Sequence, residues 1–172
     1  TPNQLFSIID EAAFKQAALE LFRFQYEHLK DYQSYCNHLG KNPENVHQLE
    51  SITIHPKQIF KSKKLMENGK AAELVFSNSG NTGSVPTRQY LASLALYEKS
   101  FTLGFERMYG PVNEWVILAL LPSYLERGDS SLVYMFDDLI KRSEQPESGF
   151  YLDNYQELIN QLLELEDNKR KT

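Results

Sequence analysis

The sequence predicts an α/β fold in which helices cover a β-sheet. Several segments carry apolar residues at helical spacing. Between those segments lie short, continuous apolar runs, which are typical of strands buried on both faces. Because strands and helices alternate along the chain, the two kinds of element are expected to form layers around a shared core.

The first part of the chain, residues 1–50, is predicted to be a helical segment. An apolar stripe from Phe14 to Phe22, which also includes Ala18 and Leu21, follows Asp10, a residue type that caps helices. A second helix is expected from about Asp31, ending at Gly40, because glycine often follows the last turn of a helix.

Residues 51–172 are predicted to be the α/β part. Residues 74–76 and 115–121 are expected to be strands of one sheet, and residues 149–152 a further short strand. Helices are expected over residues 92–109, 131–142 and 155–166. No strand pattern follows the last helix, although such a helix normally delivers the next parallel strand. We therefore expect the N-terminal portion of a larger domain, with an open C-terminal edge that could pair in a dimer.

The composition narrows the classes of protein. A net charge of −5 and a pI near 5.4 argue against a general nucleic-acid binder, which needs a basic surface. The longest apolar run, residues 115–121, is far shorter than the roughly 20 residues of a membrane span. A single cysteine, Cys36, excludes an internal disulfide and favours a cytoplasmic protein.

One loop has the residue types that bind phosphate. Residues 77–87 contain five hydroxyl side chains, two amides and two glycines, and glycine lets backbone amides approach a phosphate closely. The loop is not a Walker A sequence, because no lysine follows Gly83, and it lacks the first glycine of a dinucleotide-binding fingerprint. From composition alone, a polar surface loop that binds nothing remains the alternative.

Residues 76–88, Phe-Ser-Asn-Ser-Gly-Asn-Thr-Gly-Ser-Val-Pro-Thr-Arg, resemble the phosphate loop of adenylate-forming enzymes. Three further segments, residues 96–101, 105–111 and 121–135, look like the acyl-protein synthetase family. This family comprises the fatty-acid–protein ligases of bacterial bioluminescence and their non-luminous relatives. The N-terminal helices and the Asn-Pro-Glu turn after them are also similar to phenylacetate–CoA ligases of the same superfamily.

The resemblance implies an ATP-dependent ligase assisted by Mg²⁺. A fatty acid would be activated as its adenylate, and its acyl group would then pass to a protein thiol. The matching positions imply these ATP phosphate-binding residues: Ser77, Asn78, Ser79, Gly80, Asn81, Thr82, Gly83 and Arg88. Asn78 and Asn81 depart from the family pattern, which prefers Ser and Thr there. This chain alone is not expected to complete the reaction, because family relatives place the adenine pocket and the C-terminal lid further along.

A second group of candidates follows the predicted strand of residues 115–121. Ligands of α/β sheets bind beyond the carboxyl ends of strands. The polar residues at this place are therefore substrate-region candidates: Tyr124, Glu126, Arg127 and Asp129.

Two alternatives to a fatty-acid ligase stay open. The first is a carboxylate–CoA ligase for an aryl or short-chain acid. The second is a truncated, non-catalytic module that binds a nucleotide or a partner.

Other reactive side chains favour structural roles. Cys36 lies near Tyr32 and Leu39 in a predicted helix, so we expect a core residue rather than an acyl acceptor. The four histidines are scattered, and no metal site is predicted from them. The lysines between residues 57 and 70 favour a solvated surface, although they could also attract ATP or a carboxylate.

Overall fold

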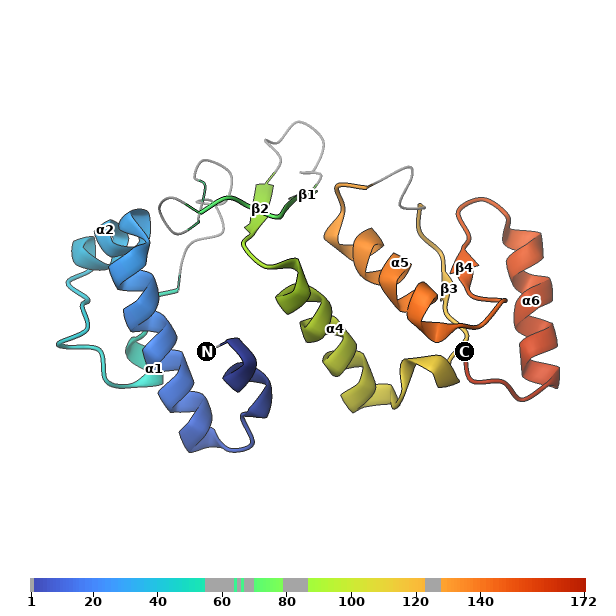
Figure 1. Ribbon diagram of the computed structural model, residues 1–172, viewed down its shortest axis with the longest axis horizontal. Coiled ribbons are helices and arrows are strands. Elements are labelled where there is room, and N and C mark those ends of the chain that lie inside the picture. The colour runs from blue at the N-terminus through green and yellow to red at the C-terminus, as the bar shows by residue number, and fades with distance from the viewer. Residues whose placement is uncertain (1, 55–63, 65, 67–69, 79–86, 123–127) are drawn as a thin grey trace. The chain divides into compact units, whose positions relative to one another are not determined.

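The computed structural model describes all residues except 1, 55–63, 65, 67–69, 79–86 and 123–127 (Figure 1). It is a mixture of helices and small sheets, compatible with the α/β class. The chain divides into two compact units. The first comprises residues 1–75 and 79–92, and the second comprises residues 76–78 and 93–172. The domain boundary expected at residue 50 stays a prediction.

Helices form the N-terminal part of the first unit. They are the 3₁₀ helix η1 (Pro2–Ser7), α1 (Glu11–His28), α2 (Lys30–His38) and the 3₁₀ helix η2 (Leu49–Ser51). The predicted cap of α1 is confirmed, since Asp10 Oδ1 accepts a hydrogen bond from the Ala13 amide at 2.7 Å. The predicted glycine stop is also confirmed, because Gly40 follows α2 with φ of +66°, a conformation that only glycine adopts easily.

The core of the first unit lies between α1 and α2. Leu19 and Phe22 of α1 cluster with Tyr32 and Cys36 of α2 and with Val46. The predicted stripe of α1 is therefore only partly a core stripe. Phe22 is 1% exposed, whereas Phe14 and Leu21 are exposed. Periodicity identifies apolar positions, but it cannot say which of them meet a partner.

Two strands flank the segment of residues 79–86. The predicted strand is confirmed as β1 (Leu74–Asn78), and it pairs with β2 (Thr87–Leu91), which the sequence analysis did not predict. The Glu73 amide donates to the Leu91 carbonyl at 2.8 Å, so the start of β1 lies beside the end of β2 and the pair is antiparallel. The predicted helix from residue 92 begins at Leu94, because Ser93 caps it through the Leu96 amide.

The second unit contains the three predicted C-terminal helices. They are α4 (Leu94–Tyr109), α5 (Ser131–Ser143) and α6 (Tyr155–Asp167), so all three predictions are confirmed. The 3₁₀ helix η3 (Val112–Glu114) and strand β3 (Leu118–Ala119) lie between α4 and α5, and β4 (Gly149–Phe150) precedes α6. Strands β3 and β4 are parallel, with Leu118 paired to Gly149 and Ala119 to Phe150.

The predicted strand of residues 115–121 is much shorter in the structure. The Trp115 amide completes η3 by donating to Val112, and the Leu121 amide turns back to Ala119. Only Leu118 and Ala119 remain in the ladder, and Leu120 is 54% exposed. The prediction that β1 and β3 share one sheet is wrong, because the described strands form two separate two-stranded sheets.

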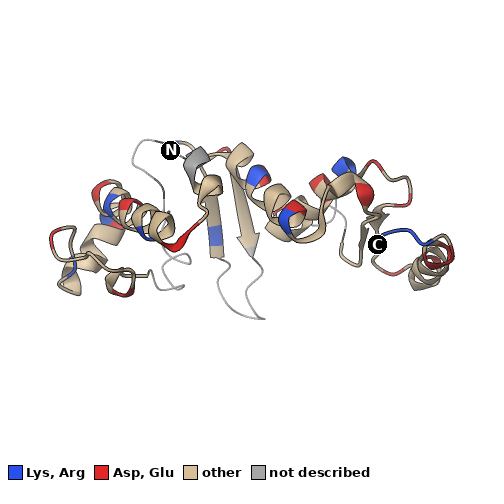
Figure 2. Ribbon diagram, turned by 90° about the horizontal axis from the view of Figure 1, so that it is seen from below, with Lys and Arg blue, Asp and Glu red and all other residues tan. Residues whose placement is uncertain are grey.

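The residues after α6 form no strand and return to the segment just before β3. The Val116 amide donates to the Lys171 carbonyl at 2.8 Å. The Lys171 ammonium bonds to Glu114 and lies 5.7 Å from the centre of the Trp115 ring. Figure 2 shows this basic end of the chain after the acidic α6. Among the described residues, no helix is long and apolar enough to cross a membrane.

Candidate functional site

The start of the predicted phosphate loop contacts the predicted substrate region. Ser77, in β1, donates its amide to the carbonyl of Asp129 at 2.7 Å. Ser77 and Asp129 lie in the same compact unit. The bond therefore holds the end of β1 beside the segment that leads into α5, and it brings together two regions that are far apart in the sequence.

The segment after Asp129 is fixed by the N-terminal cap of α5. Ser130 Oγ accepts a hydrogen bond from the Val133 amide at 3.4 Å. The amides of the first helical turn give this end of α5 a partial positive charge, which favours an anion nearby. Asp129 itself is exposed, and a carboxylate oxygen is the kind of ligand that Mg²⁺ prefers.

An aromatic cluster packs around Phe76, a residue of β1. Phe76 is 1% exposed, and its ring centre lies 5.5 Å from that of Tyr97 and 5.6 Å from that of Tyr134. Tyr97 donates to the Ser131 carbonyl at 2.9 Å, and Tyr134 donates to Glu98 at 2.5 Å. Burial raises the pKa of Tyr97, which further favours the protonated hydroxyl that donates this hydrogen bond. The cluster therefore ties β1 to both α4 and α5.

The structure describes only some of the predicted phosphate-binding residues. Ser79 to Gly83 lie outside the described residues. Ser77 is half-buried, and its amide is already bonded to Asp129, so that amide does not serve a phosphate. Asn78 ends β1, and Arg88 is exposed on β2 in the other unit. Of these candidates, Ser77 alone is shown to meet the substrate region.

The predicted substrate region is described at one position only. Asp129 lies at the contact with Ser77, whereas Tyr124, Glu126 and Arg127 are outside the described residues. The contact joins the two predicted regions through their backbones. Among the four predicted substrate-region residues, Asp129 is therefore the one that the structure describes.

Cys36 is confirmed as a core residue. Its side chain is fully buried, and burial raises the pKa of its thiol. The neighbouring Tyr32 donates its hydroxyl to the Thr53 carbonyl at 2.5 Å, and burial also raises the pKa of Tyr32. A protonated, enclosed thiol is a poor nucleophile, so Cys36 is unsuited to accept an acyl group. Within the described part of the chain, no three side chains of the metal-ligating types come together.

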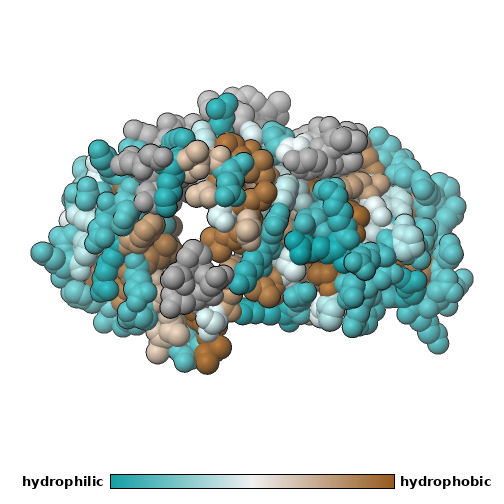
Figure 3. All heavy atoms as spheres, in the orientation of Figure 1, coloured by the Kyte–Doolittle hydropathy of each residue, from teal (hydrophilic) through white to brown (hydrophobic). Residues whose placement is uncertain are grey.

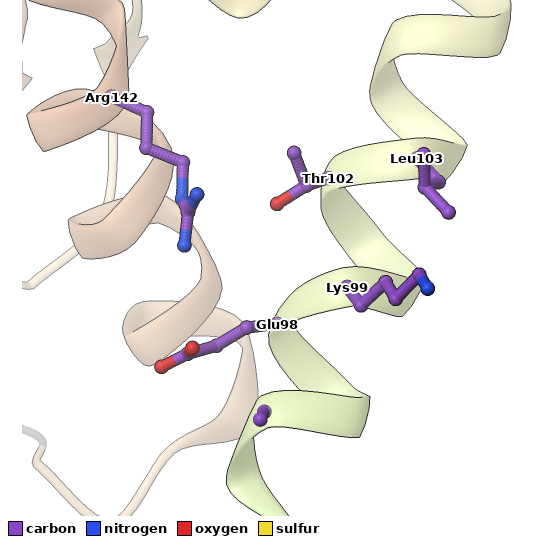
Figure 4. A pocket seen from close by; sticks show the side chains of 6 residues that line it. Glu98, Lys99, Thr102, Leu103 and Arg142 are labelled. Carbon is purple, nitrogen blue, oxygen red and sulfur yellow. The ribbon is translucent and has the colours of Figure 1, made fainter. Parts of the chain in front are cut away.

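A groove between α4 and α5 was missed by the sequence analysis. Its volume is about 270 Å³, and it is lined by Ala95, Glu98, Lys99, Thr102, Leu103 and Arg142. Glu98, Thr102 and Arg142 point into the groove, whereas Lys99 points away from it (Figure 4). Arg142 uses its Nε on Asp138, and the buried Thr102 hydroxyl has no protein partner. The i, i+4 spacing of Glu98 and Thr102 placed both on one face of a predicted helix, but no motif indicated what faces them.

The comparisons add no relative, since no family model, no curated protein and no solved structure matches this chain.

Proposed function

We propose that this chain is the phosphate-binding part of an ATP-dependent, adenylate-forming ligase that activates a fatty acid. The observation that supports the proposal most is the 2.7 Å bond from the Ser77 amide to the Asp129 carbonyl. It places the base of a loop rich in glycine and hydroxyl residues next to the start of α5. A loop of this composition and a helix N-terminus are both suited to polyphosphate.

The chemistry follows from the resemblance of residues 76–88. A carboxylate oxygen of the fatty acid attacks the α-phosphorus of ATP, a new P–O bond forms, and the bond to the β-phosphate breaks. Pyrophosphate leaves, and a protein thiol then displaces AMP from the acyl group. The Ser77 hydroxyl and the hydroxyl and backbone donors of residues 78–84 would hold the departing phosphates in line, and the exposed carboxylate of Asp129 would hold Mg²⁺.

Pyrophosphate exchange tests this function. Residues 1–172 and any longer reading frame are assayed for exchange between ATP and pyrophosphate with fatty acids, aryl acids and short-chain acids. We expect Thr82→Ala to lower acid-dependent exchange by about tenfold or more, as the loss of a positioned donor does. Ser100→Ala, in α4 outside the loop, is the matched control and should exchange normally. Absence of exchange at every length, or full exchange with Thr82→Ala, would contradict the proposal.

The acid preferred in that assay separates the fatty-acid ligase from an aryl or short-chain CoA ligase. ATP binding without exchange would instead favour a nucleotide-binding module. The exposed apolar residues of α1 favour a third candidate, a module that binds a partner.

A further inference from the structure

The groove between α4 and α5 is small and lies within one unit. All its lining residues belong to these two helices of the second unit, which pack against each other. Its volume of about 270 Å³ is at the lower end of the range for ligand pockets, so it would not enclose a nucleotide or a long-chain fatty acid. Hydrophilic residues cover much of the visible face of α5 (Figure 3). The groove therefore suits a small molecule that is at least partly polar.

The two walls of the groove carry opposite charges. Glu98 of α4 and Arg142 of α5 both point into it (Figure 4). In the described part of the chain they form no ion pair with each other, and each is held by another residue instead. Glu98 Oε1 accepts from the Tyr134 hydroxyl at 2.5 Å, and Arg142 Nε bonds to the Asp138 carboxylate. The second oxygen of Glu98 and the terminal nitrogens of Arg142 are therefore available to an occupant.

Thr102 adds an unused hydrogen-bonding group. Its Oγ1 is aimed into the groove and is buried, and it has no hydrogen-bond partner among the described residues (Figure 4). A buried hydroxyl without a partner costs free energy, which a bond to an occupant would recover. The Arg142 side chain is 44% exposed, so it can move aside to admit an occupant to this hydroxyl.

The charges of the walls select the chemical class of the occupant. A lone anion would gain Arg142 but would also lie near Glu98 and Asp138, whereas a lone cation would lie near Arg142. A zwitterion satisfies both walls, because its cation meets Glu98 while its carboxylate meets the planar fork of Arg142. A free α-amino acid carries these two groups on one carbon atom. An aliphatic side chain on that carbon would meet Ala95 and Leu103, which also line the groove.

We propose that the groove between α4 and α5 binds a free α-amino acid with an aliphatic side chain, its ammonium on Glu98 and its carboxylate on Arg142. The Thr102 hydroxyl donates to the same carboxylate. Two charge-assisted contacts in a partly exposed site correspond to a Kd of about 1 mM. The proposal does not depend on the ligase activity, because no residue of the groove belongs to the phosphate loop or to the predicted substrate region.

A chemical-shift titration of the isotope-labelled chain, residues 1–172, tests the site. Leucine is the probe, N-acetyl-leucine lacks its ammonium, and leucinamide lacks its carboxylate. We expect saturable binding of leucine and binding about tenfold weaker for each of the other two, because each loses one charge-assisted contact. No saturable binding of leucine, valine or alanine would overturn the proposal, and so would equal binding of all three leucine compounds.

Substitutions match each wall with one end of the ligand. Glu98→Gln keeps an acceptor for the Tyr134 hydroxyl but removes the charge, so it should weaken leucine about tenfold without weakening N-acetyl-leucine. Arg142→Gln should weaken leucine and N-acetyl-leucine alike without weakening leucinamide. Circular dichroism should show an unchanged helix content for both variants, since the ion pair that Arg142 forms is exposed. Equal losses for all three ligands in both variants would contradict the proposed orientation.

Thr102→Val separates binding from folding. The hydroxyl has no protein bond to lose, so the urea midpoint should stay or rise while the affinity for leucine falls several-fold. Lys99→Gln, on the same helix but pointing away from the groove, is the matched control and should bind leucine normally (Figure 4). A loss of binding in Lys99→Gln as large as that in Glu98→Gln would place the ligand outside the groove and overturn the proposal.

Discussion

Helices α1 and α5 begin in the same way, with an acceptor side chain at the N-terminal cap, but they are packed differently. The apolar face of α5 meets η3, the segment around Ile117 and α4, so Val133 and Leu139 are both 3% exposed. The apolar residues of α1 meet α2 and the residues after it on one side only. The comparison shows that similar helical patterns lead to different degrees of burial, because burial depends on how many neighbours the rest of the unit supplies.

The largest effect expected is from truncation of the core of the first unit. Phe22→Ala should lower the free energy of unfolding by about 3–5 kcal/mol, because a fully buried ring is replaced by a cavity. Far-ultraviolet circular dichroism should show an early transition in urea. The fluorescence of Trp115, the single tryptophan and part of the second unit, should keep its midpoint.

Phe24→Ala is the control for this comparison. Its side chain is 47% exposed on the same helix, so the free energy of unfolding should change by about 0.5 kcal/mol or less. If Phe22→Ala shifted the Trp115 transition as much as the circular dichroism, the two units would unfold together and the contrast between them would be lost.

A smaller effect is expected in the second unit. Ser148 Oγ accepts from the Ile117 amide at 2.9 Å and bonds to Ser143 Oγ at 2.8 Å. Ser148→Ala leaves a buried amide without its acceptor and should cost about 1–3 kcal/mol of unfolding free energy. Trp115 fluorescence in urea measures it, and Ser34→Ala, an exposed serine of the first unit, should leave that transition in place. An unchanged midpoint for Ser148→Ala would show that water replaces the hydroxyl.

The smallest effect is an alkaline loss of stability in the first unit. Burial raises the pKa of Cys36, so the folded chain keeps a proton that the unfolded chain loses. Stability is therefore complete below the ordinary thiol pKa, which is about 8.5, and falls as the pH rises above it. Urea denaturation followed by circular dichroism between about pH 8 and 9.5 should show this fall, below the range in which tyrosines ordinarily ionise.

Cys36→Ala should flatten that pH dependence, although it lowers stability at every pH. A slope that is identical with and without the thiol would assign the alkaline effect to another group. The second unit, followed through Trp115, should show no such slope over the same pH range.

The sequence was a good guide to the helices and a poor guide to the strands. Helical spacing and capping residues located α4, α5 and α6 to within two residues at each end. Strand β2 was missed because its residues do not alternate between apolar and polar types, the pattern that distinguishes a strand from the start of a helix. Residues 115–121 form so short a strand because η3 takes up the amide at one end and a turn takes up the amide at the other.

The candidate site was predictable in its residue types but not in its geometry. Glycines and hydroxyls between Ser77 and Thr87 indicated phosphate binding, because those groups suit it wherever they occur. The bond between Ser77 and Asp129 depends on tertiary packing around Phe76, which no local pattern encodes. The groove lined by Thr102 and Arg142 depends in the same way on the approach of two helices.

The return of Lys171 to Val116 occupies the backbone just before β3. A strand edge with unpaired amides and carbonyls can bind a strand of another chain and begin aggregation. Alternate residues of a strand bond to opposite edges, so the Lys171 carbonyl lies on the side of β3 that β4 leaves open. Glu114 and Trp115 hold the Lys171 side chain at that place. The Lys171 backbone and its side chain, which is ion-paired to Glu114, occupy the start of this open edge, so a strand of another chain has less room to pair there.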